Sequence, residues 1–158
     1  MKCYCAGPMR GYPQSNFAAF DSASNWLRAQ GHVVFNPADH DRETGYLGEG
    51  DLTQEQFYAM FRWDLGKVAE SDFVVFLPGW QRSKGACVER AVAFYLGLKC
   101  YDLRDLGEGC WGMSLQAPMQ EPLIPWMPKS SNTTLGYPGM GLADNGNTTP
   151  PPMRQSDR

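Results

Sequence analysis

The sequence predicts an α/β fold in which a parallel β-sheet lies between two layers of helices, and three observations predict it. Residues 73–77 (FVVFL) form a continuous apolar run of strand length, which is typical of a strand covered on both faces. Strand and helix patterns alternate as βαβαβαβ between residues 2 and 102. Turn-forming dipeptides end three of the strand patterns, namely Gly7-Pro8, Asn36-Pro37 and Pro78-Gly79.

Four strands are expected near residues 2–6, 32–35, 72–77 and 98–102. Connections between parallel strands are right-handed, so the helices fall on both faces of the sheet. The whole is a three-layer sandwich of the flavodoxin or Rossmann type, with the strand order 2-1-3-4. That order brings the carboxyl ends of the first and third strands side by side, where open α/β sheets bind their ligands.

Helical signals explain the segments after the first two strands. The first helix is expected to begin near Ser15 or Asn16, both good N-caps, and to end before Gly31. Residues 53–56 (TQEQ) fit a capping box that opens the second helix. Residues 38–51 are polar and show no period, which predicts a loop.

Composition limits the classes of function. The chain has 158 residues, a formal net charge of −3 and 42% hydrophobic residues, but no basic cluster, which argues against a nucleic-acid partner. It contains no apolar run of about 20 residues, so no membrane partner is expected. Its five cysteines include no C-x-x-C pair, and the first strand leaves no room for a signal peptide. These features predict a cytoplasmic protein with reduced cysteines.

No metal and no other cofactor is expected. The sequence Asp39-His40-Asp41 resembles a metal site, but one histidine without a spaced partner favours a solvated loop. The predicted organisation is an α/β domain over residues 1–105 and an irregular, loosely ordered tail over residues 106–158. Glycine, proline, serine, asparagine and threonine dominate that tail from residue 116 onward.

Two acidic residues lie on apolar helix faces. Glu89 shares a face with Ala86 and Ala93, and Asp64 lies in a stripe with Phe61 and Val68 when the residues are placed on a 3.6-residue period. A buried carboxylate is unfavourable unless it is paired or has a function. The residues alone leave open whether Glu89 is a reacting group or an inward acid held by an arginine or by backbone donors.

The loop after the third strand favours an anion. Gly85 lets the backbone approach a ligand closely, and the free N–H groups of the following helix attract negative charge. Trp80 in that loop would either stack on a base or cover the cleft.

Four motifs in order resemble the nucleoside 2-deoxyribosyltransferase superfamily, in particular a compact branch found in phages and prophages. They are Tyr4-Cys5-Ala6-Gly7-Pro8, Asp64, Ser71-Asp72 and Ser83-x-Gly85-x-x-x-Glu89, and the resemblance covers roughly residues 2–102. It implies a cleft for a nucleoside or nucleotide and a homodimer or higher homo-oligomer. It also implies that Glu89 attacks the anomeric carbon, that Tyr4 positions this carboxylate and that Asp64 assists at the base or sugar. Asp72 would have a structural role.

Ser83 points to one class within the superfamily. Base-exchanging transferases typically carry an aspartate six residues before the glutamate, whereas nucleoside 5′-monophosphate N-glycosidases carry serine there and an arginine that matches Arg10. The resemblance therefore implies a phosphate site built from Gly7, Pro8, Met9, Arg10, Gly11, Ser83 and Gly85. The expected function is hydrolysis of the base–sugar bond of a (deoxy)nucleoside 5′-monophosphate. The alternatives are a nucleoside deoxyribosyltransferase and a non-catalytic nucleotide sensor.

Overall fold

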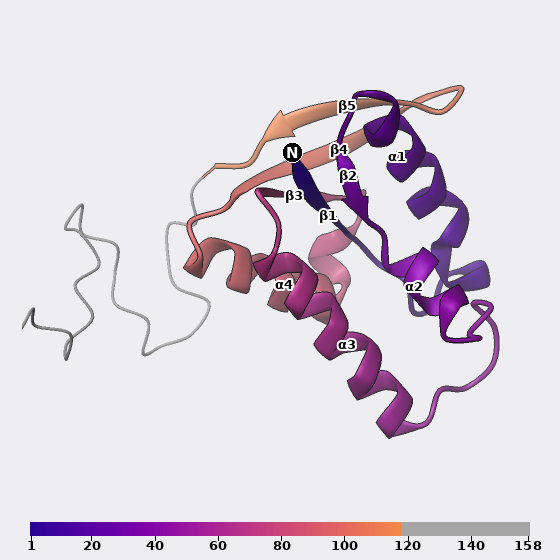
Figure 1. Cartoon of the computed structure of the whole chain (residues 1–158). Coiled ribbons are helices and arrows are strands. Elements are labelled where there is room, and N and C mark those ends of the chain that lie inside the picture. The colour runs from indigo at the N-terminus through magenta and orange to yellow at the C-terminus, as the bar shows by residue number, and fades with distance from the viewer. Residues whose placement is uncertain (118–158) are drawn as a thin grey trace, which may run out of the picture. The chain divides into compact units, whose positions relative to one another are not determined.

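The computed structural model describes residues 1–117, which belong to one compact unit (Figure 1). Its elements, in chain order, are β1 (Lys2–Ala6), η1 (Pro13–Asn16), α1 (Phe17–Ala29), β2 (Val33–Phe35), α2 (Pro37–Glu43), α3 (Gln54–Ala69), β3 (Phe73–Phe76), η2 (Trp80–Arg82), α4 (Lys84–Tyr95), β4 (Lys99–Gly107) and β5 (Cys110–Leu115).

The five strands form one sheet in the order β2-β1-β3-β4-β5. β1 to β4 are mutually parallel where they pair, and β5 is antiparallel to β4. The predicted strand positions and the predicted order 2-1-3-4 are confirmed. Ala6 pairs with Phe76, and the Leu77 N–H donates to the Ala6 carbonyl at 2.8 Å, so the loops after β1 and β3 leave the sheet side by side.

Helices cover both faces of the sheet, which confirms the three-layer architecture (Figure 1). On one face, α1 buries Phe17, Phe20 and Leu27 together with alternate residues of β1 and β3, including Cys5 and Val75. On the other face, Val68 of α3 and Ala93 of α4 pack with Tyr4, Val74 and Phe76. Because side chains alternate along a strand, β1 directs Tyr4 toward α3 and α4.

The first correction concerns α2, because the sequence predicted a loop over residues 38–51. The Asn36 side chain accepts a hydrogen bond from the Ala38 N–H at 3.0 Å, and Pro37 occupies the first turn. Asparagine as N-cap followed by proline is a strong signal for a helix start. The Asn36-Pro37 pair ends β2 and also begins a helix.

The second correction concerns residues after Asp105, where the sequence predicted irregular chain. β4 continues to Gly107, and β5 pairs with it from Cys110. The turn between them uses positive φ angles at Gly107, Glu108 and Gly109, two of which are glycines that adopt this conformation without strain. The α/β unit therefore includes residues 106–115, which the predicted boundary excluded. The rest of the predicted tail, from residue 118, lies outside the described residues, and the division into two domains stays a prediction.

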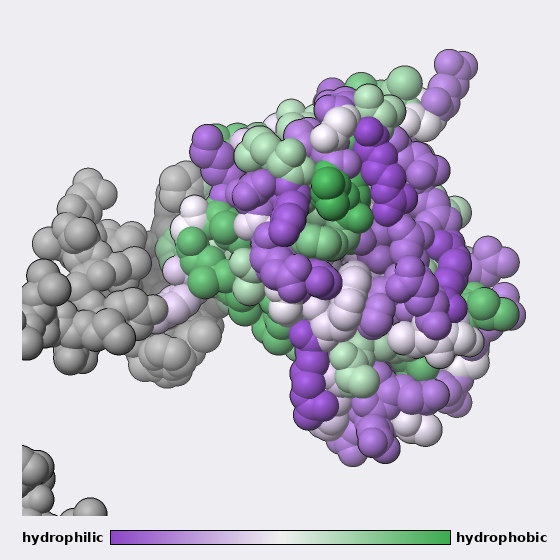
Figure 2. All heavy atoms as spheres, viewed as in Figure 1, coloured by the Kyte–Doolittle hydropathy of each residue, from purple (hydrophilic) through white to green (hydrophobic). Residues whose placement is uncertain are grey.

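The surface is mixed in character. On the face drawn in Figure 2, hydrophilic side chains predominate and hydrophobic ones lie in smaller patches between them. Within residues 1–117 no helix has the length and hydrophobicity needed to cross a membrane.

Candidate active site

A cavity of about 560 Å³ opens at the carboxyl edge of the sheet. Its volume is within the range of small-molecule sites, roughly 300–1,000 Å³. Its walls come from the loops after β1 and β3, from α2 and α3, and from the first turns of α4. Most of the residues that the sequence predicted for a site line it, namely Gly7, Pro8, Met9, Arg10, Asp64, Ser83, Gly85 and Glu89.

Two predicted residues do not line the cavity. Tyr4 is fully buried beneath it, and its hydroxyl donates a hydrogen bond to Glu89 Oε1 at 2.8 Å. Gly11 lies outside the lining, and its φ of 79° shows that it forms a turn in the loop after β1. The structure therefore joins Tyr4 to the cavity through Glu89 and gives Gly11 a role in the backbone turn.

Glu89 is a buried acid without a cation. It is 5% exposed on α4, and within residues 1–117 its hydrogen-bond partner is the Tyr4 hydroxyl. Burial raises the pKa of Glu89, and the nearby charge of Asp64 raises it further. An acid held only for stability would be paired with an arginine or with several donors. Within residues 1–117 Glu89 has neither an arginine partner nor several donors.

Asp64 faces the same cavity from α3. Burial is the main reason why the pKa of Asp64 is raised. The Tyr4 hydroxyl interacts with both carboxyl groups, but it has one proton and directs it to Glu89. Burial raises the pKa of both acids toward neutral pH, so the pair holds a proton there that either carboxyl group can carry, and the Tyr4 hydrogen bond favours the ionised form of Glu89.

The loop after β1 is packed tightly against its neighbours. A Cβ atom on Gly7 would lie 2.9 Å from Leu77 Cβ, so only glycine lets the two loops run together. The Asn16 side-chain amide donates to the Pro8 carbonyl at 2.8 Å. The Arg10 guanidinium lies over the Phe57 ring, 4.4 Å from its centroid, which directs this cation toward the cavity.

The first turn of α4 provides the other side of the predicted phosphate site. The Ser83 Oγ accepts a hydrogen bond from the Ala86 N–H at 3.3 Å, and its own hydroxyl proton stays available for an anion. A Cβ atom on Gly85 would lie 3.7 Å from the Phe61 ring and would occupy space at the cavity wall. Arg82 and Lys84, which the sequence analysis did not select, add two cations to the lining.

Asp41 is the most important residue that the sequence analysis missed. It lies on α2, is 7% exposed and lines the cavity. Burial raises the pKa of its carboxyl group from 3.8 to about 6, although Arg10 and Arg42 oppose this shift. The Asn36-Pro37 helix start was the available signal, because it places Asp41 on a helix near the sheet edge.

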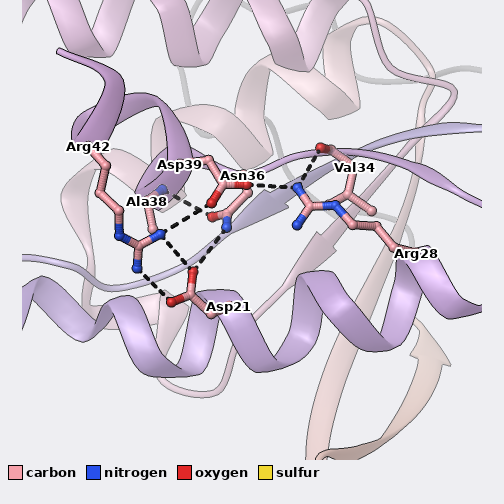
Figure 3. A network of polar contacts seen from close by, with 7 residues as sticks. All are labelled: Asp21, Arg28, Val34, Asn36, Ala38, Asp39 and Arg42. Carbon is pink, nitrogen blue, oxygen red and sulfur yellow. Dashed lines mark hydrogen bonds and ion pairs between the residues drawn. The ribbon is translucent and has the colours of Figure 1, made fainter.

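A network of polar contacts fixes α2 against α1 and β2 (Figure 3). Arg42 donates to both carboxylate oxygens of Asp21 on α1, at 3.0 and 2.6 Å, and to Asp39 at 3.2 Å. Arg28 of α1 donates to Asp39 at 2.7 Å. The guanidinium of Arg42 is thus committed to Asp21 and Asp39, and Asp41 is left to face the cavity.

Ser15 and Tyr46 also line the cavity and were not predicted as site residues. The Ser15 hydroxyl donates to the Gly48 carbonyl at 3.0 Å and lies 3.1 Å from the Tyr46 hydroxyl. Residues 14–16 all have positive φ angles, a conformation that is unfavourable for residues other than glycine. Such strain often occurs at functional sites.

Several other predictions are resolved by the contacts. Trp80 does not line the cavity, because it packs on Phe76 and donates to Asp102 Oδ1 at 2.8 Å. Asp72 accepts a hydrogen bond from the Lys2 N–H at 2.7 Å, which is the structural role predicted for it. His40 stacks on Trp63 with centroids 4.0 Å apart. No group of three potential metal ligands occurs within the described part of the chain.

Residues 1–102 match the family described as "Domain of unknown function (DUF4406)". The chain belongs to this family. The DUF4406 match includes every cavity residue named above. No curated protein matches the chain by sequence.

Among solved structures, the fold is similar to that of a 2-deoxyribosyltransferase from the psychrotolerant bacterium Bacillus psychrosaccharolyticus. The two share 22% sequence identity with a TM-score of 0.50, over 63% of this chain and 69% of the other. The resemblance inferred from the sequence motifs is therefore confirmed at the level of the fold.

Proposed function

We propose that this protein is an N-glycosidase that hydrolyses the base–sugar bond of a (deoxy)nucleoside 5′-monophosphate. The observation that carries the proposal is the buried Glu89 carboxylate, which accepts a hydrogen bond from Tyr4 and faces Asp64 in the same cavity. A carboxylate and a protonated carboxyl group are the pair that glycoside cleavage needs, because its transition state resembles an oxocarbenium ion.

The chemistry divides into two balanced steps. In the first, a Glu89 oxygen forms a bond to the anomeric carbon while the C–N bond breaks, and the departing base nitrogen takes the proton of Asp64. In the second, water attacks the anomeric carbon, the Glu89 carboxylate leaves, and the water proton returns to Asp64. Tyr4 orients Glu89, and its hydrogen bond favours the ionised carboxylate before the bond to the anomeric carbon forms.

The proposed phosphate site uses the basic and hydroxyl groups of the lining. Arg10, Ser83 and the free N–H groups at the start of α4 provide a cation, a hydroxyl donor and a favourable helix dipole. Ser83 is neutral, whereas an aspartate at this position would repel a phosphate. This difference favours a nucleotide over a free nucleoside as the substrate.

A deoxyribosyltransferase is the second candidate, because the similar solved structure is described as one. Its first step would be the same, but a second base instead of water would attack the anomeric carbon. A non-catalytic sensor is the third candidate. It would use Arg10 and Ser83 without needing the Glu89–Asp64 pair.

One experiment separates the three candidates. The full-length chain is incubated with a panel of ribo- and deoxyribonucleoside 5′-monophosphates and the matching nucleosides, and free base is measured by chromatography. Hydrolysis of monophosphates by the wild type, absent in Glu89→Gln, supports the glycosidase. Product formed only when a second base is added identifies a transferase. Binding of nucleotides without release of any base would overturn catalysis and leave the sensor.

A further inference from the structure

Asp41 has the features of a ligand contact that the reaction above does not use. It is 7% exposed, it lines the cavity, and no group of residues 1–117 hydrogen-bonds its carboxylate. The two nearest cations are engaged elsewhere, Arg10 on the Phe57 ring and Arg42 with Asp21 and Asp39. Because the Asp41 carboxylate oxygens reach the solvent of the cavity, an N–H donor of a ligand would replace water there.

The three acids of the cavity lie in a row, with Asp64 between Glu89 and Asp41. The charge of Asp64 acts on Glu89, and the charge of Asp41 acts on Asp64. The elements α4, α3 and α2 supply them in that order. If Glu89 contacts the sugar and Asp64 the departing nitrogen, Asp41 is the acid placed to contact the far edge of the base.

Charge decides what this part of the cavity accepts. A phosphate would be repelled by Asp41 and Asp64, so the uncharged base occupies this side and the phosphate lies at Ser83 and the start of α4, where Arg82 and Lys84 add positive charge. An ionised carboxylate has two acceptor oxygens and no donor. It therefore complements a base edge that carries adjacent N–H donors, and guanine, with its N1–H and 2-amino group, is the base with two of them.

We propose that Asp41 is the base-specificity residue of this site and selects a guanine nucleotide by accepting hydrogen bonds from the N1–H and 2-amino groups. The proposal rests on the proposed function for the orientation of the nucleotide in the cavity. Hypoxanthine lacks the amino group and loses one hydrogen bond. Adenine presents an acceptor nitrogen to the carboxylate and is repelled.

The test compares the binding of GMP, IMP and AMP to the full-length wild type by titration calorimetry, with dGMP, dIMP and dAMP in parallel. A bidentate contact of this kind predicts binding of GMP about 10- to 100-fold tighter than that of IMP, with AMP weaker still.

In Asp41→Asn, one acceptor becomes an amide donor, which fits the N1–H and the 2-carbonyl of xanthine. This variant should lose the preference for GMP and bind XMP more tightly than GMP. Asp39→Asn is the matched control, because Asp39 is on the same helix but outside the cavity lining, and it should keep the wild-type order.

The outcomes separate this proposal from the proposed function. Selective binding of GMP that Asp41→Asn abolishes, without release of any base, supports Asp41 and overturns the glycosidase. Release of base with GMP and IMP bound equally by the wild type overturns Asp41 and leaves the glycosidase. A thermal melt of Asp41→Asn confirms folding, and the wild-type ratio of GMP to IMP binding decides the proposal even if that variant does not fold. Failure of every nucleotide to bind overturns both.

Discussion

The two walls of the cavity differ in how they hold their charges. The acids Glu89 and Asp41 are buried, at 5% and 7% exposure, whereas Arg10, Arg82 and Lys84 at the cationic wall are exposed. Burial shifts the pKa of the acids toward neutral pH, whereas the cations stay in contact with water. This difference suits the two walls to two different roles. The acidic wall is suited to proton transfer and bond formation, and the cationic wall to attracting an anion that does not react.

The largest effect is expected at the acidic wall. Glu89→Gln is nearly isosteric and keeps an acceptor for Tyr4, but its amide cannot form the bond to the anomeric carbon. Turnover should fall by about 10⁴-fold or more, with nucleotide affinity nearly unchanged. Steady-state kinetics and calorimetry measure the two quantities. The exposed acid Glu70 pairs with Lys67 away from the cavity, so Glu70→Gln is the control and should retain full activity. Full activity in Glu89→Gln would show that the acidic wall does not carry out the reaction.

Asp64→Asn should give the next effect, because an amide cannot protonate the departing base. General acid catalysis typically contributes about 10²- to 10⁴-fold. The loss should be greatest for bases that leave poorly without protonation, so the measured rate would depend more steeply on the base pKa than in the wild type. An equal loss for every base would place the proton donor elsewhere.

Arg10→Ala tests the cationic wall and should change affinity more than rate. A charged hydrogen bond contributes about 1.5–3 kcal/mol, which corresponds to weaker monophosphate binding by roughly 10- to 100-fold. Nucleosides should bind as before, and the salt dependence of monophosphate binding should decrease. Calorimetry at two salt concentrations gives both results. Arg104→Ala, at an exposed arginine of β4 outside the lining, is the control. Equal weakening for nucleosides and monophosphates would assign Arg10 to the base or sugar.

The smallest effect concerns stability. The pKa of Asp41 is raised from 3.8 to about 6 in the folded protein. The folded state therefore holds its proton more tightly than the unfolded state, and this group lowers stability as pH rises from about 4 to above 6. Asp41→Asn should raise the free energy of unfolding by up to about 2 kcal/mol at pH 7.5, with almost no gain below pH 4. Urea unfolding at both pH values checks this. Asp39→Asn loses ion pairs instead and should not stabilise at either pH. A gain of equal size at both pH values would show that desolvation of the charge is not the cause.

The positions of Tyr4 and Glu89 at the cavity were predictable because their signals are local. An apolar run marks β3, and a glutamate on an apolar helix face marks Glu89. The strand order then brings the ends of β1 and β3 together and places Tyr4 under Glu89. Each inference uses a period or a rule of topology that a single sequence displays.

The part of the cavity formed by α2 and Asp41 was not predictable in the same way. A helix as short as α2 spans two turns, too few to show a period, and it is held by contacts such as that between Arg42 and Asp21, which lie 21 residues apart. The hairpin of β4 and β5 was missed because its Gly107-Glu108-Gly109 turn also resembles the start of an irregular tail. The α2 contacts are long-range, whereas the hairpin is local and was hidden by its glycine-rich turn.

The polar network of Figure 3 holds α2, a short helix in which substitutions should be tolerated. A helix of seven residues has little stability of its own, and ion pairs between side chains that are 36–41% exposed contribute at most about 1 kcal/mol each. Substitutions in α2 should therefore put little of the global stability at risk, whereas Glu89, the proposed nucleophile, is buried on α4 and bonded to Tyr4 of β1. On the proposed function, substitutions in this one segment would change which base the cavity accepts and would leave the residues proposed for cleavage in place.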